Sequence, residues 1–300
     1  MKFKKSIKQL RSNKQVNYLI RNLLRLLNLD KLYRYWPISG TIYLSIDPFE
    51  GKFFSKGDDY LVSDIWYHRR YDEINELKFL SDFITRSEKS NPVFFDIGAF
   101  NGIYSILLKK RHPDLSVYAF EPHPENFKRL SKNLAINDLS IVHLDCAISE
   151  ADKIVEFYIP HDNSLTTVSS IKEEFSKKWN VRKKIKIKSK SVDQIVREFK
   201  VVPDIIKIDV EGSEYAVFSG AVQVITKHRP LIVIEAFSSK LDPHEFNKRF
   251  PQLVEIEEIV IKNHYSTRFF VENNLVSSNS FNVNNPTRNF ILIPNGSSVF

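Results

Sequence analysis

Between residues 93 and 235, short apolar runs alternate with segments of helical spacing, and this alternation constrains the fold more than any other feature. The pattern predicts strands at 93–96, 117–121, 141–145, 205–209 and 231–235, and helices at 103–110, 124–134, 191–199 and 213–225. Runs that are apolar on both faces and are separated by helices form parallel sheets with helices on both sides. We therefore expect an α/β fold with a mostly parallel sheet.

The segments on either side of this region depart from the alternation. Two β-like runs, at 253–261 and 290–293, are separated by a polar stretch from 273 to 285 that has no helical spacing. Consecutive strands without a helix between them pair antiparallel, so we expect a hairpin at the edge of the sheet. Before the sheet, residues 37–60 have the pattern of short strands and turns, and residues 65–84 have helical spacing.

The positive charge of the chain lies almost entirely in its first 36 residues. The net charge is +8, but residues 1–36 hold ten Lys and Arg with one acid, Asp30, whereas the remainder holds 34 basic and 35 acidic residues. A nucleic-acid-binding protein presents a basic face on its folded domain. The neutral main part of this chain therefore argues against a nucleic-acid partner.

Residues 1–36 also contain a segment with the pattern of a basic amphipathic helix. Arg21, Arg25 and Asn28 lie on one side, and the other side carries Val16, Leu19, Ile20, Leu23, Leu24 and Leu27. We expect this helix to pack on the main domain and to present its arginines to water. The alternative is that it makes peripheral contact with an anionic membrane surface.

The sequence favours a cytoplasmic protein. No run approaches the ~18 apolar residues of a membrane-spanning helix, and the basic N-terminus lacks the pattern of a secretory signal. The single cysteine, Cys146, excludes an intramolecular disulfide and a cysteine-built zinc site, which fits a reducing compartment. Peripheral contact with the membrane is compatible with this location.

A glycine-containing turn and a more distant acid predict a cleft that binds a nucleoside. The first predicted strand ends in Asp96, and Gly98 and Gly102 follow before a helix, so the backbone turns tightly and a ligand can approach it. Glu121 ends the second strand, 23 residues after Gly98. An acid at about this separation is positioned to accept the hydroxyls of a ribose.

The acids at the strand ends discriminate between the two cofactor classes that use such a cleft. Asp96, Asp209 and Glu211 would repel the pyrophosphate of a dinucleotide and would suit the ammonium and sulfonium of S-adenosylmethionine. Phe100 also interrupts the G-x-G-x-x-G pattern, so NAD is disfavoured. An alternative role for Asp96 is to cap the following helix. For Asp145, a role in its turn and a contact to adenine are equally compatible with the pattern.

Three ordered blocks of the sequence resemble the signature motifs of the FkbM-type methyltransferases. They are Asp96–Ala99, then Phe120–Phe127 with Leu130 and Asn133, and then Lys207–Glu214, which follows a similar short segment at Ser191–Ile195. The resemblance extends from about Ile65 to Phe237. One departure is Phe100, because the family usually has Asn directly after the Gly-Ala pair and this chain has its Asn at position 101.

The resemblance implies a Rossmann-like class I methyltransferase fold, with a mostly parallel seven-stranded sheet and a reversed terminal hairpin. The pattern of the preceding residues adds an N-terminal helical and β extension. We accordingly divide the chain into a basic helical segment at 1–36, an extension with acceptor-side elements at 37–90 and a catalytic domain at 91–300. The implied reaction is methyl transfer from S-adenosylmethionine to a hydroxyl on a glycan, a lipid-linked sugar or a secondary metabolite. The candidate cofactor contacts are Asp96, Gly98, Ala99, Asn101, Gly102, Glu121, Pro122, Asn126, Asp145, Cys146 and Asp209.

Methyl transfer to a hydroxyl also needs a base within hydrogen-bond reach of the acceptor proton. The candidates are Asp209, Glu211 and Glu235, which lie at or just after the ends of predicted strands. We expect Asp209 to lie beside the methyl donor and Glu211 or Glu235 to remove the proton. Asp209 and Glu235 could instead share a Mg²⁺ ion that polarises the hydroxyl.

Two further interpretations remain open. The aromatic and basic cluster Tyr67–Tyr71 could contact an anionic or glycan-like acceptor, or it could be a solvated helix face. The chain as a whole could be a non-catalytic module that binds the cofactor or a partner at a membrane surface. An NAD-dependent oxidoreductase is a weaker alternative.

Overall fold

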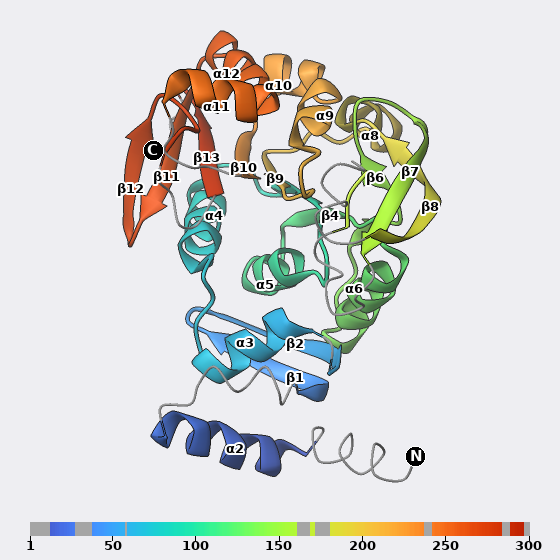
Figure 1. The fold of residues 1–300 in the computed structure, drawn as a ribbon, viewed down its shortest axis with the longest axis vertical. Coiled ribbons are helices and arrows are strands. Elements are labelled where there is room, and N and C mark those ends of the chain that lie inside the picture. The colour runs from blue at the N-terminus through green and yellow to red at the C-terminus, as the bar shows by residue number, and fades with distance from the viewer. Residues whose placement is uncertain are drawn as a thin grey trace.

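A large mostly parallel sheet runs through the centre of the molecule, and helices cover both of its faces (Figure 1). The computed structural model describes residues 13–27, 38–57, 59–160, 169–171, 181–236, 242–283 and 289–296. The parallel strands are β3 (Val93–Ile97), β4 (Ser116–Phe120), β5 (Val142–Leu144), β9 (Ile205–Ile208) and β10 (Leu231–Glu235). The predicted α/β architecture and the five predicted parallel strands are confirmed.

Three further strands extend the sheet beyond β10. β13 (Asn289–Pro294) runs antiparallel to β10, β11 (Tyr265–Val271) runs antiparallel to β13, and β12 (Asn274–Ser278) pairs with β11 as a hairpin. The order across the sheet is β12-β11-β13-β10-β9-β3-β4-β5. The reversal at this edge was expected. In the described part of the chain the sheet has eight strands instead of seven, because polar residues after position 273 form the additional strand β12.

The strand predicted at 253–261 is wrong, because these residues lie in helix α12 (Pro251–Lys262). Leu253, Ile256 and Val260 are buried at helical spacing, while Glu255 and Glu258 are exposed on the outer face. The β-branched residues of this segment are typical of strands and concealed the helical period. The chain reaches the sheet again only at β11.

Alternate residues of each central strand enter two different hydrophobic cores, one on each face of the sheet. Phe94 belongs to one core and Phe95 to the other, and Ile205 and Ile206 divide in the same way. This burial on both faces explains why the strands form continuous apolar runs in the sequence. The first core is covered by α4 (Ile74–Arg86), α5 (Ile103–Arg111) and α6 (Pro124–Ile136), and the second by α8 (Val192–Phe199), α9 (Glu214–Ser219), α10 (Val222–His228), α11 (Pro243–Arg249) and α12.

A small sheet follows β5 and flanks the carboxyl end of the main sheet. It consists of β6 (Ala147–Ile148), β7 (Lys153–Pro160) and β8 (Val181–Lys190), in the order β6-β8-β7. β7 and β8 pair antiparallel along most of their length. This sheet therefore forms one wall beside the strand ends at which the predicted cleft lies.

The N-terminal extension begins with a hairpin of β1 (Ser39–Ile46) and β2 (Phe49–Lys56), and helix α3 (Tyr60–His68) follows it. Two side chains of α6 bind the backbone of β2. Asn133 Oδ1 accepts a hydrogen bond from Phe54 N at 2.7 Å, and Asn137 exchanges two hydrogen bonds with the backbone of Lys52, at 2.8 and 2.6 Å. The asparagines thus take the place that a neighbouring strand would have.

Helix α2 (Lys14–Leu26) packs on this extension as expected (Figure 1). Only part of its apolar side faces inward, because Leu24 packs against the core while Asn17 and Arg21 are buried beside it. Arg21 is 5% exposed, and its guanidinium carbon lies 4.5 Å from the ring centroid of Trp66. Leu19 and Leu23 are instead 67% and 54% exposed. The expectation that the arginines face water is wrong for Arg21, because its guanidinium stacks on an aromatic ring. No helix among the described residues is long and apolar enough to cross a bilayer.

Candidate active site

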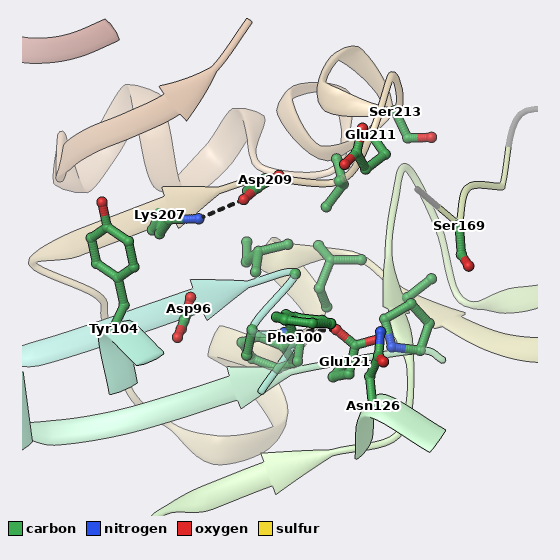
Figure 2. Close-up of a pocket in the computed structure, with 18 of the residues that line it drawn as sticks. Asp96, Phe100, Tyr104, Glu121, Asn126, Ser169, Lys207, Asp209, Glu211 and Ser213 are labelled. Atoms are coloured by element: carbon green, nitrogen blue, oxygen red, sulfur yellow. Dashed lines mark hydrogen bonds and ion pairs between the residues drawn. The ribbon is translucent and has the colours of Figure 1, made fainter. Parts of the chain in front are cut away.

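A cavity of about 220 Å³ lies at the carboxyl ends of β3, β4 and β9 (Figure 2). In open α/β sheets this edge is where ligands bind. The ends of these three strands and the turns after them supply about half of the lining, and Tyr71 and Glu73 enter from the N-terminal extension. The small sheet contributes Ile148 and Phe157 to the opposite wall. The cavity therefore has a polar floor at the strand ends and a partly apolar side.

The turn after β3 has a backbone that only glycine adopts easily. Gly98 has φ +83°, and a Cβ atom at this position would lie 1.8 Å from the carbonyl oxygen of Asp209. The loop after β9 therefore packs directly on the glycine turn. Phe100 is also left-handed, with φ 52°, and its N–H is directed at a carboxylate oxygen of Glu121, 2.8 Å away. A left-handed non-glycine residue costs about 1–2 kcal/mol and is often found at functional sites.

Glu121 is held rigidly at the end of β4. One carboxylate oxygen accepts from Phe100 N, and the other accepts from His123 N at 2.8 Å and from Asn126 Nδ2 at 3.5 Å. Burial raises the pKa of Glu121 to about 7, and the two backbone hydrogen bonds oppose this rise. His123 Nδ1 in turn accepts from the first N–H groups of α6 and so caps that helix. The carboxylate thus lines the cavity with its orientation fixed before any ligand arrives.

Lys207 is a buried cation among several acids. Its ammonium lies 2.9 Å from a carboxylate oxygen of Asp209 and 4.8 Å from the ring centroid of Tyr104. Burial opposes the charge, but Asp209, Glu73 and Asp96 together outweigh burial and raise the pKa of Lys207. One lysine therefore partly neutralises three carboxylates at the floor of the cavity.

Asp96 combines a position in the lining with a structural role. Its Oδ2 accepts from Ser105 N at 3.2 Å and from Ser105 Oγ at 2.6 Å, so it binds the first turn of α5. The capping interpretation is confirmed by these contacts. Burial raises the pKa of Asp96, while Lys207 and Ser105 act in the opposite direction. The side chain is 1% exposed, yet it borders the cavity.

Glu73 was not predicted from the sequence. Its Oε2 accepts from Tyr71 Oη at 3.0 Å and from Tyr104 Oη at 2.7 Å, and all three residues line the cavity. Burial raises the pKa of Glu73. No motif marks this residue, because it comes from the segment before α4 and reaches the strand ends only through the tertiary fold. Within the predicted cluster Tyr67–Tyr71, only Tyr71 lines the cavity, and Tyr67 lies in the hydrophobic core.

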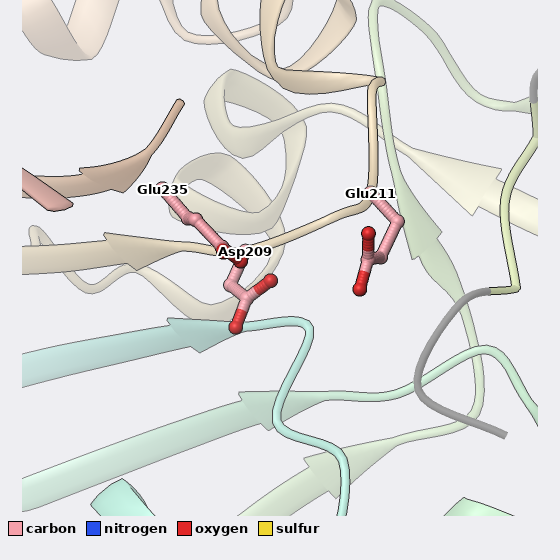
Figure 3. Close-up of side chains that lie close together, drawn as sticks. All are labelled: Asp209, Glu211 and Glu235. Carbon is pink, nitrogen blue, oxygen red and sulfur yellow. The ribbon is translucent and has the colours of Figure 1, made fainter. Parts of the chain in front are cut away.

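Asp209, Glu211 and Glu235 form a cluster of carboxylates (Figure 3). One oxygen of each lies within 4.8 Å of the others. Asp209 and Glu211 line the cavity, whereas Glu235 lies behind Asp209 and outside the lining. The pKa of Glu235 is raised far above its usual range, first by the charge of Asp209, then by burial and by a hydrogen bond between Glu235 and Asp209. The three acids also offer the oxygen donors that a hard divalent cation prefers.

The remaining predicted residues divide into two groups. Ala99, Pro122, Asn126 and Cys146 line the cavity. Burial raises the pKa of Cys146 to about 12, so its thiol is an apolar surface at neutral pH.

Asn101, Gly102 and Asp145 lie outside the lining. Asn101 Nδ2 donates to Asp59 Oδ2 at 3.0 Å, and Gly102 precedes α5 with φ +83°. Asp145 is exposed in the turn after β5. These three residues stabilise or border the turns around the cavity without facing it.

The sequence is similar to known methyltransferases. The methyltransferase FkbM domain matches residues 96–266. The chain is 30% identical over 161 residues to methyltransferase sdnD of Sordaria araneosa, a match that covers 44% of this chain and 61% of that protein, less than two thirds of its length. It is 25% identical over 191 residues to hexuronic acid methyltransferase AglP of Haloferax volcanii, covering 62% of this chain and 72% of that protein.

A solved structure of methyltransferase FkbM from Methylobacillus flagellatus aligns with a TM-score of 0.42 at 15% identity, over 94% of this chain and 72% of that one. The domain match begins at Asp96 and includes Glu121, Asp209 and Glu235. It also covers more than half of the chain. The chain therefore belongs to the FkbM methyltransferase family.

Proposed function

We propose that this methyltransferase uses S-adenosylmethionine and methylates a hydroxyl oxygen of a sugar-containing acceptor. The observation that carries the proposal is the charge of the cavity. Glu121 is fixed at the end of β4, where an acid binds a ribose, while Glu73, Asp96 and Asp209 surround one lysine on the floor. Such a site suits a cationic nucleoside and repels a phosphate-bearing one.

The residues of the cavity fit the parts of this cofactor. Glu121 would accept the ribose hydroxyls, and the glycine turn at Gly98 lines the cavity beside it. Glu73 and Asp96 would balance the ammonium of the amino-acid part. Cys146 and Phe157 would offer apolar contacts to the base. S-adenosylmethionine supplies a methyl group on a cationic sulfur, which an oxygen nucleophile takes by in-line displacement.

Glu211 is the residue to which we assign removal of the acceptor proton. It lines the cavity, and its left-handed backbone, with φ 53°, is the kind of strain that is stored at functional sites. Glu235 lies behind Asp209 and, because of its raised pKa, keeps its proton at neutral pH. Of the two candidates from the sequence, Glu211 is therefore favoured. Asp209, fixed by Lys207, would orient the hydroxyl.

A sugar acceptor is supported by the similarity to a protein named hexuronic acid methyltransferase. We assign to the acceptor side also residues 160–180, between β7 and β8; most of them lie outside the described residues, but Ser169 and Ile171 line the cavity. The assay therefore needs a panel of glycans, lipid-linked sugars and hydroxylated metabolites, with incorporation of labelled methyl groups as the readout.

Calorimetric titration with S-adenosylhomocysteine and with NAD tests the cofactor assignment. We expect the first to bind and the second not to bind, and we expect Glu121→Ala to weaken binding of the first. A protein that binds S-adenosylhomocysteine but transfers no methyl group to any acceptor would support the non-catalytic module instead. Binding of NAD alone would contradict the proposal.

A metal-assisted reaction is the second candidate, and the cluster of Asp209, Glu211 and Glu235 favours it. A cation there would polarise the acceptor hydroxyl. Turnover that is lost in EDTA and restored by Mg²⁺ would assign the cluster to a metal. Turnover that is unchanged in EDTA would assign the cluster to proton removal.

A further inference from the structure

The outer face of α2 is an apolar stripe with no covering element in the described structure. Leu19, Leu23, Leu26 and Leu27 are 67%, 54%, 80% and 54% exposed. At 100° per residue these four positions fall within ~100° of arc on the helix. The described chain exposes thirteen large apolar side chains, and five of them lie between residues 18 and 27. The exposure is therefore concentrated and not scattered over the surface.

The orientation of α2 is set by contacts on its inner face. Asn17 and Arg21 are 3% and 5% exposed, and Leu24 packs against the hydrophobic core. The guanidinium of Arg21 lies 5.0 Å from the ring centroid of Tyr18 and 4.5 Å from that of Trp66. Turning the leucines inward would break these contacts. The apolar stripe is therefore a fixed property of the folded protein.

A groove of about 470 Å³ lies between α2, β1 and α3, and the part of α2 that lines it is Asn17, Tyr18 and Arg21, next to the stripe residue Leu19 in the sequence. Arg21 and Arg69 line it together with the aromatic rings of Tyr18, Tyr43 and Trp66. Cationic and aromatic side chains next to an apolar surface are the combination found at the interface between lipid headgroups and acyl chains. The groove is thus suited to an anionic headgroup beside the leucines.

The charge of the surrounding sequence identifies the kind of surface that would cover the stripe. Residues 1–36 carry ten basic residues and one acid. An anionic bilayer attracts such a segment, whereas the core of a protein interface is depleted of charged residues. In Figure 1, α2 is the outermost element at its end of the molecule, so a flat surface can reach it along its length.

We propose that α2 is a docking surface for anionic phospholipid membranes, with its leucine stripe inserted among the acyl chains and the adjacent arginine-lined groove at the level of the headgroups. The proposal does not depend on the identity of the methyl donor or acceptor. Helix α3 links the two regions, because Trp66 lines the groove and Leu61 lines the active-site cavity. Docking through α2 would hold the acceptor side of the enzyme near the membrane.

Co-flotation of the full chain with vesicles tests the docking surface. The vesicles are phosphatidylcholine alone and phosphatidylcholine mixed with phosphatidylglycerol, each at low and high salt. The test variant is Leu19→Gln with Leu23→Gln, and the matched control is Ile261→Gln, because Ile261 is 66% exposed on α12. Circular dichroism and S-adenosylhomocysteine binding report whether each variant is folded.

We expect the wild type to bind the mixed vesicles, and salt to weaken this binding. The double variant should bind on the order of 100-fold more weakly, because two leucines no longer transfer into the acyl region. The control should bind as the wild type does. Absence of vesicle binding, or binding that the double variant retains, would overturn the proposal. So would a dimer in light scattering that the double variant dissociates, since the stripe would then be covered by a second copy.

Discussion

Burial of Glu121 should make the stability of the protein fall as pH rises, and the substitution Glu121→Gln should remove this pH dependence. Burial raises the pKa of this carboxyl from 4.5 to about 7. Between these values the unfolded chain releases the proton and the folded protein keeps it, so folding is penalised increasingly as pH rises from about 4.5 through about 7. At pH 8 the penalty is about 3 kcal/mol, and at pH 5 it is below about 1 kcal/mol.

Glutamine has no charge to bury, so the penalty disappears in the variant. The free energy of unfolding of the variant relative to the wild type should therefore increase by about 2.5 kcal/mol between pH 5 and pH 8. The variant also loses hydrogen bonds, because Phe100 N and His123 N donate to the two carboxylate oxygens and an amide offers only one acceptor. That loss is about 1–3 kcal/mol, but it is independent of pH and cancels in the comparison.

Urea denaturation of both proteins at pH 5 and pH 8, without cofactor, measures this difference. A suitable control is Glu125→Gln in the neighbouring turn, because Glu125 is exposed and its pKa is lowered by Lys128. Between pH 5 and pH 8, the free energy of unfolding of Glu125→Gln relative to the wild type should decrease slightly, because the pKa of Glu125 is lowered and not raised. If Glu121→Gln gave no change between the two pH values, or a change that favoured the wild type at pH 8, the reasoning about the buried carboxyl would be wrong.

Three further predictions concern the same site. Gly98→Ala should destabilise the protein by about 3 kcal/mol or more in urea denaturation and abolish S-adenosylhomocysteine binding, because the added Cβ atom meets the backbone of the loop after β9. The control Gly296→Ala places its Cβ atom in open space and should lower the free energy of unfolding by only about 1 kcal/mol. Lys207→Met should destabilise by about 3 kcal/mol in the same assay, since it leaves the buried Asp96 and the half-buried Glu73 and Asp209 without their cation. Glu211→Gln should lower the rate of methyl transfer by a factor of about 10²–10⁴ without weakening S-adenosylhomocysteine binding. Glu235→Gln should lower the rate less at neutral pH. Equal losses of rate in the two variants would contradict the assignment of Glu211 as the base.

The position of the cleft could be predicted because strand ends in a parallel sheet converge at one edge. Gly98, Glu121 and Asp209 are far apart in the sequence, but each follows an apolar run, and the topology brings them together. Glu73 could not be found in this way. It follows no strand, and it contacts Tyr104 only because the N-terminal extension folds back over the sheet.

Two predictions, for α2 and for residues 253–261, were wrong for the same physical reason. The residue pattern of a segment does not determine which element packs against it. The whole apolar side of α2 was expected to face the protein, but Arg21 stacks on Trp66 of α3, and Leu19 and Leu23 are exposed. Residues 253–261 have a strand-like composition, yet their burial has helical spacing. In both segments the neighbouring element determines which side chains are buried, and the sequence of the segment alone does not contain that information.

The bonds from Asn133 and Asn137 to the backbone of β2 make the hairpin inseparable from the sheet domain. A chain shortened to begin at residue 91 would leave both carboxamides without these partners and would uncover the side of the core that Phe53 and Leu44 fill. The same bonds occupy a strand edge that could otherwise recruit a strand from another molecule. Truncation at that point should therefore produce aggregation and not an independent catalytic unit.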